Sequence, residues 1–484
     1  MKHQILRLGK DSLIYGLGSV ITRFIGLLML PLFTAYLKPK EYGVLSMLAL
    51  LTMVAQPVFS LGLSAAMGPS YFDGNNPHTK SEAVWTVFTI NMISASLLVA
   101  LAWTFPEILG QLVRLPAEYA FLVGLTLTGS ALTILVTSFT QQVQFEKHAR
   151  LYILVTIATS LTAIFLSVLM VVFLGWGVQG MVVGQLAGNI VTFFAFLLIG
   201  FNATKPAISM DMAKKLLRQG LPLVPSFAFL FILMHANKFI LEREAGLGVV
   251  GIYSIGFNLG MGMSIVTGGI ATAWYPFFMS FINRQKETEI LFGRILTYYV
   301  FVVGFICLLF FLGAKPVVLL LTKGSFNNAY SIVGLVALGN FAQTLFNFFL
   351  PGVYFHKDIR VLSLVQGLAA LVALPINYLF IVNFGMLGAG IGIAANNIFM
   401  AGLMFGWNCL NRSRYTVIKY EWARVFSFIL FFLGIILIYM QLPATSTTSE
   451  IIKTILISGL AFFGMFFLLN KQEKSILIQK LTNK

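Results

Sequence analysis

The sequence predicts an all-α membrane protein that crosses the lipid bilayer about fourteen times. Hydrophobic residues make up 58% of the 484 residues, charged residues only 10%, and the mean hydropathy is +0.90. A soluble protein carries roughly a quarter charged residues. The apolar runs are about 20 residues long, the length that a helix needs to cross the hydrocarbon layer. Because lipid offers the backbone no hydrogen bonds, such continuous runs must be helices.

We place one helix on each apolar run, in order along the chain. They are expected near 12–37, 43–67, 83–106, 118–141, 151–174, 178–200, 217–241, 247–280, 291–313, 328–352, 359–382, 386–409, 424–440 and 451–470. The first run is too long for a cleaved signal peptide and is expected to be a retained first helix. The run 247–280 exceeds one straight span and is expected to continue beyond the membrane surface.

Basic residues predict the orientation of these helices. Most of the 32 Lys and Arg residues fall in loops on one side of the membrane, among them Lys214, Lys215 and Arg218. Few fall on the opposite side, for example Lys38 and Lys40. Since cytoplasmic loops carry the excess of Lys and Arg, both termini are expected in the cytoplasm. This topology accounts for the net charge of +16 without a nucleic-acid partner.

Parts of the sequence recur about 208 positions later. The matched positions, each written with its copy, are Gly43 and Gly251, Gly177 and Gly385, Gly184 and Gly392, and Asn189 and Asn397. Their shared order predicts a duplicated unit of about 200 residues, and the alternative is chance similarity between glycine-rich apolar helices. Duplication of that size in a membrane protein is typical of a transporter with its site between the halves.

The repeat predicts three parts of the chain. We expect a six-helix lobe over 1–208, a second six-helix lobe that repeats it over 209–415, and an appended two-helix hairpin with a cytoplasmic tail over 416–484. Six predicted helices separate each position from its copy, so both halves enter the membrane in the same direction and are parallel.

Four segments together carry a family resemblance. Residues 23–43 read RFIGLLMLPLFTAYLKPKEYG, 173–180 read FLGWGVQG, 220–225 read GLPLVP and 250–254 read VGIYS. In this order they resemble the polysaccharide-transporter branch, the Wzx-like O-antigen-unit flippases, of the multidrug/oligosaccharidyl-lipid/polysaccharide (MOP) exporter superfamily. The resemblance covers nearly the whole chain, although its single motifs are mostly loose patterns of glycine and proline.

The resemblance implies a fold and a function. It implies two six-helix lobes around a central cavity, and alternating access that moves undecaprenyl-pyrophosphate-linked sugar units from the inner to the outer leaflet of the bacterial inner membrane. A polysaccharide polymerase and chain-length proteins are the partners to expect. The product would be O-antigen, capsule or exopolysaccharide, and the sugar cannot be read from these motifs.

The first predicted helix carries an ionised residue near the middle of the membrane. Arg23 shares one helix face with Tyr15 and Ser19 at 100° per residue. A charge at this depth is costly unless it faces protein or a watery cavity. Arginine binds phosphate through two parallel hydrogen bonds, so this face is a candidate cavity wall for a phosphate-bearing substrate. The alternative is that Arg23 binds helix carbonyls or reaches the membrane surface.

The seventh predicted helix offers candidates for substrate binding and ion coupling. His235 and Lys238 lie one turn apart, and Glu242 follows Lys238 by four residues. Lys238 has two interpretations: it binds the substrate, or its side chain reaches the outer surface of the membrane. Because an unperturbed histidine side chain titrates near neutral pH, His235 is a candidate for proton coupling, together with Glu242 and with Asp11 at the start of the first helix. A hydrogen-bonded structural histidine is the other interpretation.

Two further helices each present a face of amides. Gln185 and Asn189 share a face of the sixth predicted helix, and Asn340, Gln343 and Asn347 share one of the tenth. These side chains could bind sugar hydroxyls. They could equally form hydrogen bonds between helices.

The absence of other patterns limits the function. All sixteen carboxylates lie in predicted loops or near helix ends, which disfavours a multidrug/cation antiporter. The sequence has no Gly-x-x-x-x-Gly-Lys loop and no His/Glu zinc pattern, and Cys307 and Cys409 form no predicted disulfide, so we expect no cofactor, no metal and no enzyme activity. The loops expected outside are too short for a polymerase or ligase site. A peptidoglycan lipid-precursor flippase stays an alternative.

Overall fold

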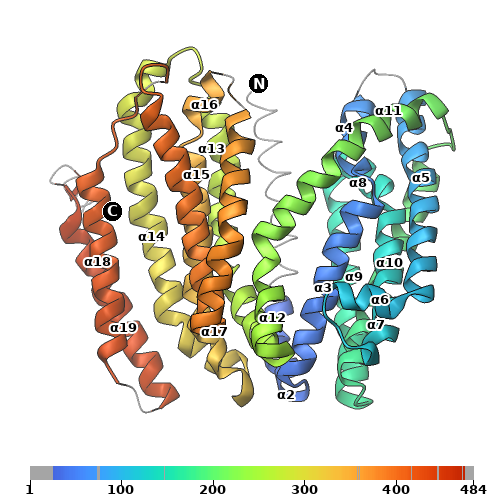
Figure 1. Cartoon of the computed structure of the whole chain (residues 1–484), viewed down its shortest axis with the longest axis horizontal. Coiled ribbons are helices and arrows are strands. Elements are labelled where there is room, and N and C mark those ends of the chain that lie inside the picture. The colour runs from blue at the N-terminus through green and yellow to red at the C-terminus, as the bar shows by residue number, and fades with distance from the viewer. Residues whose placement is uncertain are drawn as a thin grey trace. The chain divides into compact units, whose positions relative to one another are not determined.

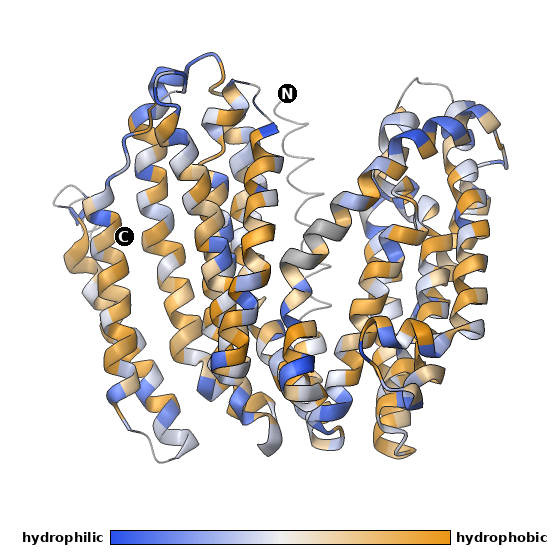
Figure 2. Cartoon of the chain, in the orientation of Figure 1, coloured by the Kyte–Doolittle hydropathy of each residue, from blue (hydrophilic) through white to orange (hydrophobic). Residues whose placement is uncertain are grey.

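The computed structural model describes residues 25–72, 77–146, 148–356, 358, 360–415, 417–443, 446–470 and 473–474 (Figure 1). All regular structure within these residues is helical, which confirms the predicted all-α class. Ten of the described helices are long and apolar enough to cross a membrane, or eleven if the bent pair Met234–Gly260 and Met263–Met279 is one span. Figure 2 shows that these long helices are mainly apolar. The fourteen spans and the two-lobe arrangement stay predictions.

The chain divides into two compact units, the first ending at Gly251 and the second beginning at Ile252. Unit 1 holds α2 (Leu30–Tyr36), α3 (Pro39–Phe59), α4 (Leu63–Phe72), α5 (Pro77–Thr104), α6 (Pro106–Leu112), α7 (Ala120–Leu135), α8 (Thr137–Phe145), α9 (Ala149–Val168), α10 (Gly177–Ala203), α11 (Met210–Gly220) and most of α12 (Val224–Gly260). Unit 2 holds α13 (Met263–Met279), α14 (Thr288–Leu321), α15 (Tyr330–Phe348), α16 (Pro351–Phe355), α17 (Arg360–Leu410), α18 (Trp422–Gln441) and α19 (Thr447–Leu468). The predicted division at 208 and 415 stays a prediction.

The helix predicted over 247–280 is broken in the structure. The chain bends by 46° between the end of α12 at Gly260 and the start of α13 at Met263. Gly260 and Gly262 flank this bend, and glycine is a weak helix former, so the helix can end here at low cost. The prediction of one continuous helix was therefore wrong. A further break lies earlier in α12, at Gly246, where φ is 78°.

Gly177 and Gly385, which are paired in the repeat, both have a positive φ. Gly177 has a φ of 52° and Gly385 a φ of 56°, values that favour glycine. Gly177 begins α10, which packs on α9. Gly385 lies inside α17, and a Cβ on Gly392 would overlap the side-chain oxygen of Asn377. α17 is therefore two helices that fold back on each other at Gly385, as the separate predicted helices 359–382 and 386–409 require.

Within unit 1, α3 and the last part of α12 cross each other, and a pair of glycines lies at the crossing. A Cβ on Gly43 would overlap the carbonyl of Leu247, and a Cβ on Gly251 would overlap the carbonyl of Pro39. The two backbones therefore touch with no side chain between them. Leu247 and Gly251 follow Pro39 and Gly43 by 208 positions, so the two contacts are equivalent under the repeat.

Aromatic residues with hydrogen-bonded polar groups fill the core of each unit. In unit 1, Trp85 packs edge-on against the buried Phe139, and its indole N–H donates to the carbonyl of Thr204 at 3.3 Å. In unit 2, the indole N–H of Trp274 donates to the carbonyl of Asn347 at 2.9 Å. Buried indoles need such partners, and here the partners fix neighbouring segments of chain.

The two C-terminal helices, predicted over 424–440 and 451–470, are present as α18 and α19. The carboxylate of Glu450 is buried and forms ion pairs with Lys315 on α14 and, at 2.9 Å, with Lys453. The hydroxyl of Tyr439 donates to the same carboxylate at 3.2 Å. Because a buried carboxylate needs charged or hydrogen-bonding partners, this cluster joins α14, α18 and α19.

Candidate functional site

Four of the predicted site residues lie outside the described part of the chain. They are Asp11, Tyr15, Ser19 and Arg23. The cavity wall around Arg23 therefore stays a prediction, as does the role of Asp11 in coupling. The remaining predicted residues are described and fall into three places: α10 and α12 in unit 1, and α15 in unit 2.

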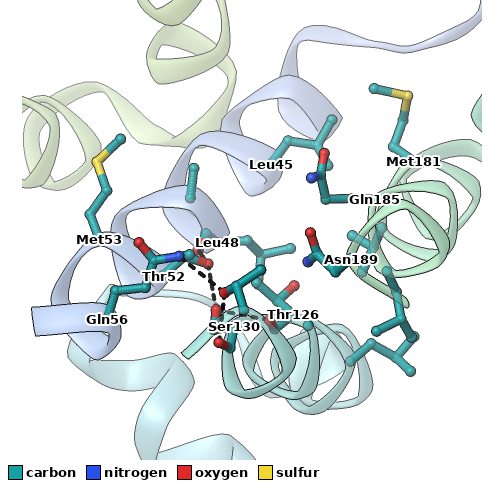
Figure 3. A pocket seen from close by; sticks show the side chains of 16 residues that line it. Leu45, Leu48, Thr52, Met53, Gln56, Thr126, Ser130, Met181, Gln185 and Asn189 are labelled. Carbon is teal, nitrogen blue, oxygen red and sulfur yellow. Dashed lines mark hydrogen bonds between the residues drawn. The ribbon is translucent and has the colours of Figure 1, made fainter. Parts of the chain in front are cut away.

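Unit 1 encloses a pocket of about 490 Å³ between α3, α7 and α10 (Figure 3). This volume is within the range of small-molecule sites. The lining residues are Leu45, Leu48, Ala49, Thr52, Met53 and Gln56 from α3, Leu125, Thr126, Gly129, Ser130 and Thr133 from α7, and Met181, Val182, Gln185, Leu186 and Asn189 from α10. Every polar group in this lining is a hydroxyl or an amide, and none is charged.

α3 and α7 supply one polar wall of the pocket. Thr52 and Gln56 are four residues apart and so share a face of α3. The hydroxyl of Ser130 lies 3.3 Å from that of Thr52, and the amide of Gln56 lies 3.4 Å from the hydroxyl of Thr133. Both distances are at the long end for hydrogen bonds. A ligand that offers hydroxyl groups could therefore replace these bonds at little cost.

α10 supplies the opposite wall, with the two amides that the sequence singled out. Gln185 and Asn189 point into the pocket, Gln185 beside Leu45 and Asn189 beside Thr126 (Figure 3). In the described part of the chain, neither amide forms a hydrogen bond with another protein group. Of the two interpretations of these amides, bonding between helices therefore has no support here. Their groups remain available to a ligand.

Lys238 and Glu242 have separate partners in unit 1. Lys238 is only 7% exposed, and its ammonium donates to the hydroxyl of Ser46 on α3 at 2.9 Å. The interpretation that Lys238 reaches the outer surface is therefore wrong, because the side chain is buried between α12 and α3. Glu242 lies 3.8 Å from the guanidinium of Arg114. His235 is half-buried beside the ring of Phe231, and its role in coupling stays a prediction.

The amides of α15 differ from those of α10. Asn340 is buried and donates to the carbonyl of Val336 at 3.0 Å and to the sulfur of Met261 at 3.4 Å. Gln343 is exposed and Asn347 is half-buried. These bonds are of the structural kind that was the alternative for Asn340, and its substrate role stays a prediction. The substrate role of Gln343 and Asn347 stays a prediction.

The hydroxyl wall of the pocket was not predicted from the sequence. Thr52 and Gln56 on α3, and Thr126, Ser130 and Thr133 on α7, could have been found by the spacing of three or four residues that revealed Gln185 and Asn189. Short hydroxyl side chains are common in membrane helices, where they often bond to their own backbone. Thr133 does so here, with its hydroxyl 2.7 Å from the carbonyl of Ser130. Spacing alone therefore carries little information for these residues.

The fold resembles solved structures of membrane transporters. A structure of the lipid II flippase MurJ in an inward closed conformation has a TM-score of 0.76 and 14% identity, and the match covers 97% of this chain and 100% of that chain. An inward-facing multidrug resistance MATE family transporter of the MOP superfamily has a TM-score of 0.66 and 16% identity, over 80% and 93% of the chains. A MOP superfamily transporter from Pyrococcus furiosus has a TM-score of 0.55 and 17% identity, over 83% and 94%. At these identities the likeness concerns the fold.

The chain is a multi-pass helical membrane protein whose fold is that of the MOP-superfamily and MurJ structures. No curated protein sequence matches the chain. Residues 8–282 match the family described as polysaccharide biosynthesis protein, which is more than half of the chain, and the protein belongs to that family. This confirms the resemblance on which the sequence analysis relied. The structures that share the fold are those of transporters and flippases, not of enzymes.

Proposed function

We propose that this protein is a flippase for undecaprenyl-pyrophosphate-linked oligosaccharide units, the precursors of O-antigen, capsule or exopolysaccharide. It moves them across the bacterial inner membrane by alternating access, with both termini in the cytoplasm. Membership of the polysaccharide biosynthesis family supports this class of substrate. A polysaccharide polymerase and chain-length proteins are the partners that would receive the product.

The observation that carries the proposal is the chemistry of the pocket in unit 1. Its polar groups are hydroxyls and amides, and the amides of Gln185 and Asn189 have no protein partner in the described residues. Amides and hydroxyls donate and accept hydrogen bonds and so match the hydroxyl groups of a sugar. A pocket without a carboxylate has no group that would attract an organic cation. This argues against the multidrug/cation antiporter.

The pyrophosphate needs a positive partner, which Arg23 and Lys238 are the candidates to supply. Lys238 is a buried cation inside the membrane-spanning part of the chain, and burial of an ammonium is costly unless it serves structure or function. Coupling to an ion gradient would use His235, with Asp11 and Glu242 as further candidates. These roles belong to the proposal.

A second candidate is a flippase for a peptidoglycan lipid precursor. The similarity of almost the whole chain to the lipid II flippase MurJ favours it. Both substrates combine a lipid, a pyrophosphate and sugars, so the fold suits either. The two substrates differ in the head group attached to the pyrophosphate.

Transport into sealed vesicles that contain only this protein tests both candidates. Vesicles are loaded in parallel with a lipid-linked oligosaccharide unit, with lipid II, and with a fluorescent organic cation, and the appearance of each on the opposite side is timed. We expect the oligosaccharide unit to cross fastest. Faster lipid II would establish the second candidate, and transport of the cation alone would refute the proposal.

Variants of the pocket connect transport to the amides. The double exchange Gln185→Ala and Asn189→Ala removes two ligand hydrogen bonds at about 0.5–1.5 kcal/mol each, so the apparent affinity should fall about 5- to 150-fold. The matched control is Asn383→Ala, because Asn383 is exposed and bonds to the carbonyl of Leu379 in its own helix. Equal affinities in the double variant and the control would remove the pocket from the substrate path.

A further inference from the structure

α11 is a short amphipathic helix attached firmly to unit 1. The hydroxyl of Ser209 caps its first turn by accepting from the N–H of Met212 at 3.3 Å. Met212 and Leu216 are buried in the core that contains α4 and α5. The segment before α11 is held as well, because Ser81 donates to the carbonyl of Lys205 at 2.7 Å. The position of α11 on this bundle is therefore fixed by packing.

The opposite face of α11 combines basic and apolar side chains. Met210, Lys214, Arg218 and Leu221 fall within about 80° of one another at 100° per residue. Lys214 and Arg218 are exposed, Met210 is 72% exposed and Leu221 is 49% exposed. In the part of the chain that the structure describes, neither Lys214 nor Arg218 forms an ion pair.

α11 lies at the level where the membrane helices of unit 1 end. Met210 follows the candidate membrane span Gly177–Ala203 by only seven residues, and the intervening segment is tied to α5. Figure 1 shows α11 running across the end of the bundle, beside α4 and α5. A helix in this position has its exposed face at the border of headgroups and acyl chains.

We propose that the exposed face of α11 binds the anionic phospholipid headgroups of the cytoplasmic leaflet. Lys214 and Arg218 contact the phosphates, while Met210 and Leu221 enter the boundary between headgroups and acyl chains. Charge complementarity favours this ligand. Lys214 and Arg218 have no ion pair among the residues that the structure describes, and the cytoplasmic leaflet is the negatively charged surface that basic segments bind. The excess of Lys and Arg in the same predicted loops places α11 on that side.

Anionic lipid would thereby act on the segment that leads into α12. Gly220 ends α11, and a Cβ there would lie 2.6 Å from the carbonyl of Leu61, so the end of α11 is packed closely against the turn before α4. α12 begins at Val224, three residues after Leu221. Lipid that binds α11 therefore stabilises the start of the helix that carries Lys238. The inference is independent of the substrate.

A nitroxide at position 210 tests the proposal in the full-length protein. Met210→Cys is labelled in a background where Cys307 and Cys409 are replaced, and the protein is placed in vesicles of phosphatidylcholine with or without phosphatidylglycerol. We expect the label to be reached by oxygen and shielded from a water-soluble nickel complex only in the anionic vesicles. A label that is equally exposed to water in both kinds of vesicle would overturn the proposal. The exposed face of α11 would then be a surface for a soluble protein partner.

Charge variants measure the contribution of the two cations. Each basic residue near an anionic surface contributes about 1 kcal/mol, so Lys214→Gln with Arg218→Gln should shift the ratio of lipid-embedded to water-exposed label about 30-fold. The matched control is Lys286→Gln with Arg412→Gln, which removes two exposed charges from predicted loops on the same side of the membrane. An equal shift in the control would overturn the proposal.

Salt provides a test that needs no charge variant. At 1 M salt the Debye length falls to about 3 Å, so the label on the protein with Lys214 and Arg218 intact should move toward water in anionic vesicles. A label that stays embedded at high salt would show that apolar insertion alone holds α11, and would refute the role of the two cations.

Discussion

Replacement of Gly251 by alanine tests the backbone contact between α3 and α12. The added Cβ would overlap the carbonyl of Pro39 and lie 2.8 Å from the backbone nitrogen of Gly43. Both obstacles are backbone atoms, which cannot turn away as a flexible side chain can. The two helices must therefore move apart. Overpacking of this kind costs about 1–3 kcal/mol.

A glycine-to-alanine substitution where the Cβ meets no other atom should instead stabilise the protein. Gly268 lies inside α13, and a Cβ there has no atom within 4 Å. Because alanine favours the helix over glycine, Gly268→Ala should stabilise the protein by up to about 1 kcal/mol. The assay is unfolding in mixed micelles with increasing denaturing detergent, followed by helical circular dichroism. The midpoints of the two variants should lie on opposite sides of that of the unmodified protein.

The double variant separates the shared contact from general strain. Gly43→Ala and Gly251→Ala act at one crossing, so the second should cost less once the first has separated the helices. Equal midpoints for Gly251→Ala and Gly268→Ala would refute the reasoning. Fully additive costs would show that the two positions are strained independently.

Three more outcomes follow from contacts of single side chains. Ser46→Ala removes the 2.9 Å hydrogen bond from Lys238 and should lower the free energy of unfolding by about 1.5–3 kcal/mol, measured in the same micelles, whereas an unchanged value would contradict the contribution of that bond. Burial alone would raise the pKa of Glu473, but the hydrogen bonds that its carboxylate accepts, including one from the backbone of Asn470, lower this pKa overall. The carboxylate therefore stabilises the fold above about pH 4.5, and this contribution disappears as the pH falls further. Unfolding of Glu473→Gln should therefore depend less on pH below about 4.5 than that of the unmodified protein, and parallel pH profiles would exclude this contribution. Thr52→Asp places a carboxylate in the pocket, and should weaken binding of the sugar while creating affinity for an organic cation. Equilibrium dialysis of both ligands measures this change. An unchanged preference would mean that the charge of the pocket does not select the ligand.

The sequence predicted one wall of the pocket, because a single helix determines it. Gln185 and Asn189 are one turn apart, so they share a face of any helix that contains them. The other wall depends on which helices lie beside α10, and no periodicity within one helix contains that information. Thr52 and Ser130 face these amides only because α3 and α7 pack there.

The helix breaks were predicted in part. The change of direction at Gly385 was expected, because a turn is needed between two spans of about 20 residues. The bend after Gly260 was missed, because the chain has many glycines in apolar runs and only packing decides which of them ends a helix. The bond of the buried Lys238 to Ser46 was not predicted, since Ser46 lies 192 positions earlier in the chain.

If the chain arose by the predicted duplication, the crossing at Gly43 and Gly251 descends from a contact between two copies of a half-length protein. Pro39 contacts Gly251, and Leu247, the counterpart of Pro39, contacts Gly43, which is the pattern of a two-fold interface between identical subunits. Before the duplication, the half-length ancestor would have met a second copy of itself through one glycine on the symmetry axis. A bulky residue at that position would have entered the interface of this ancestor twice, so the predicted duplication implies that glycine was already favoured there in the homodimer.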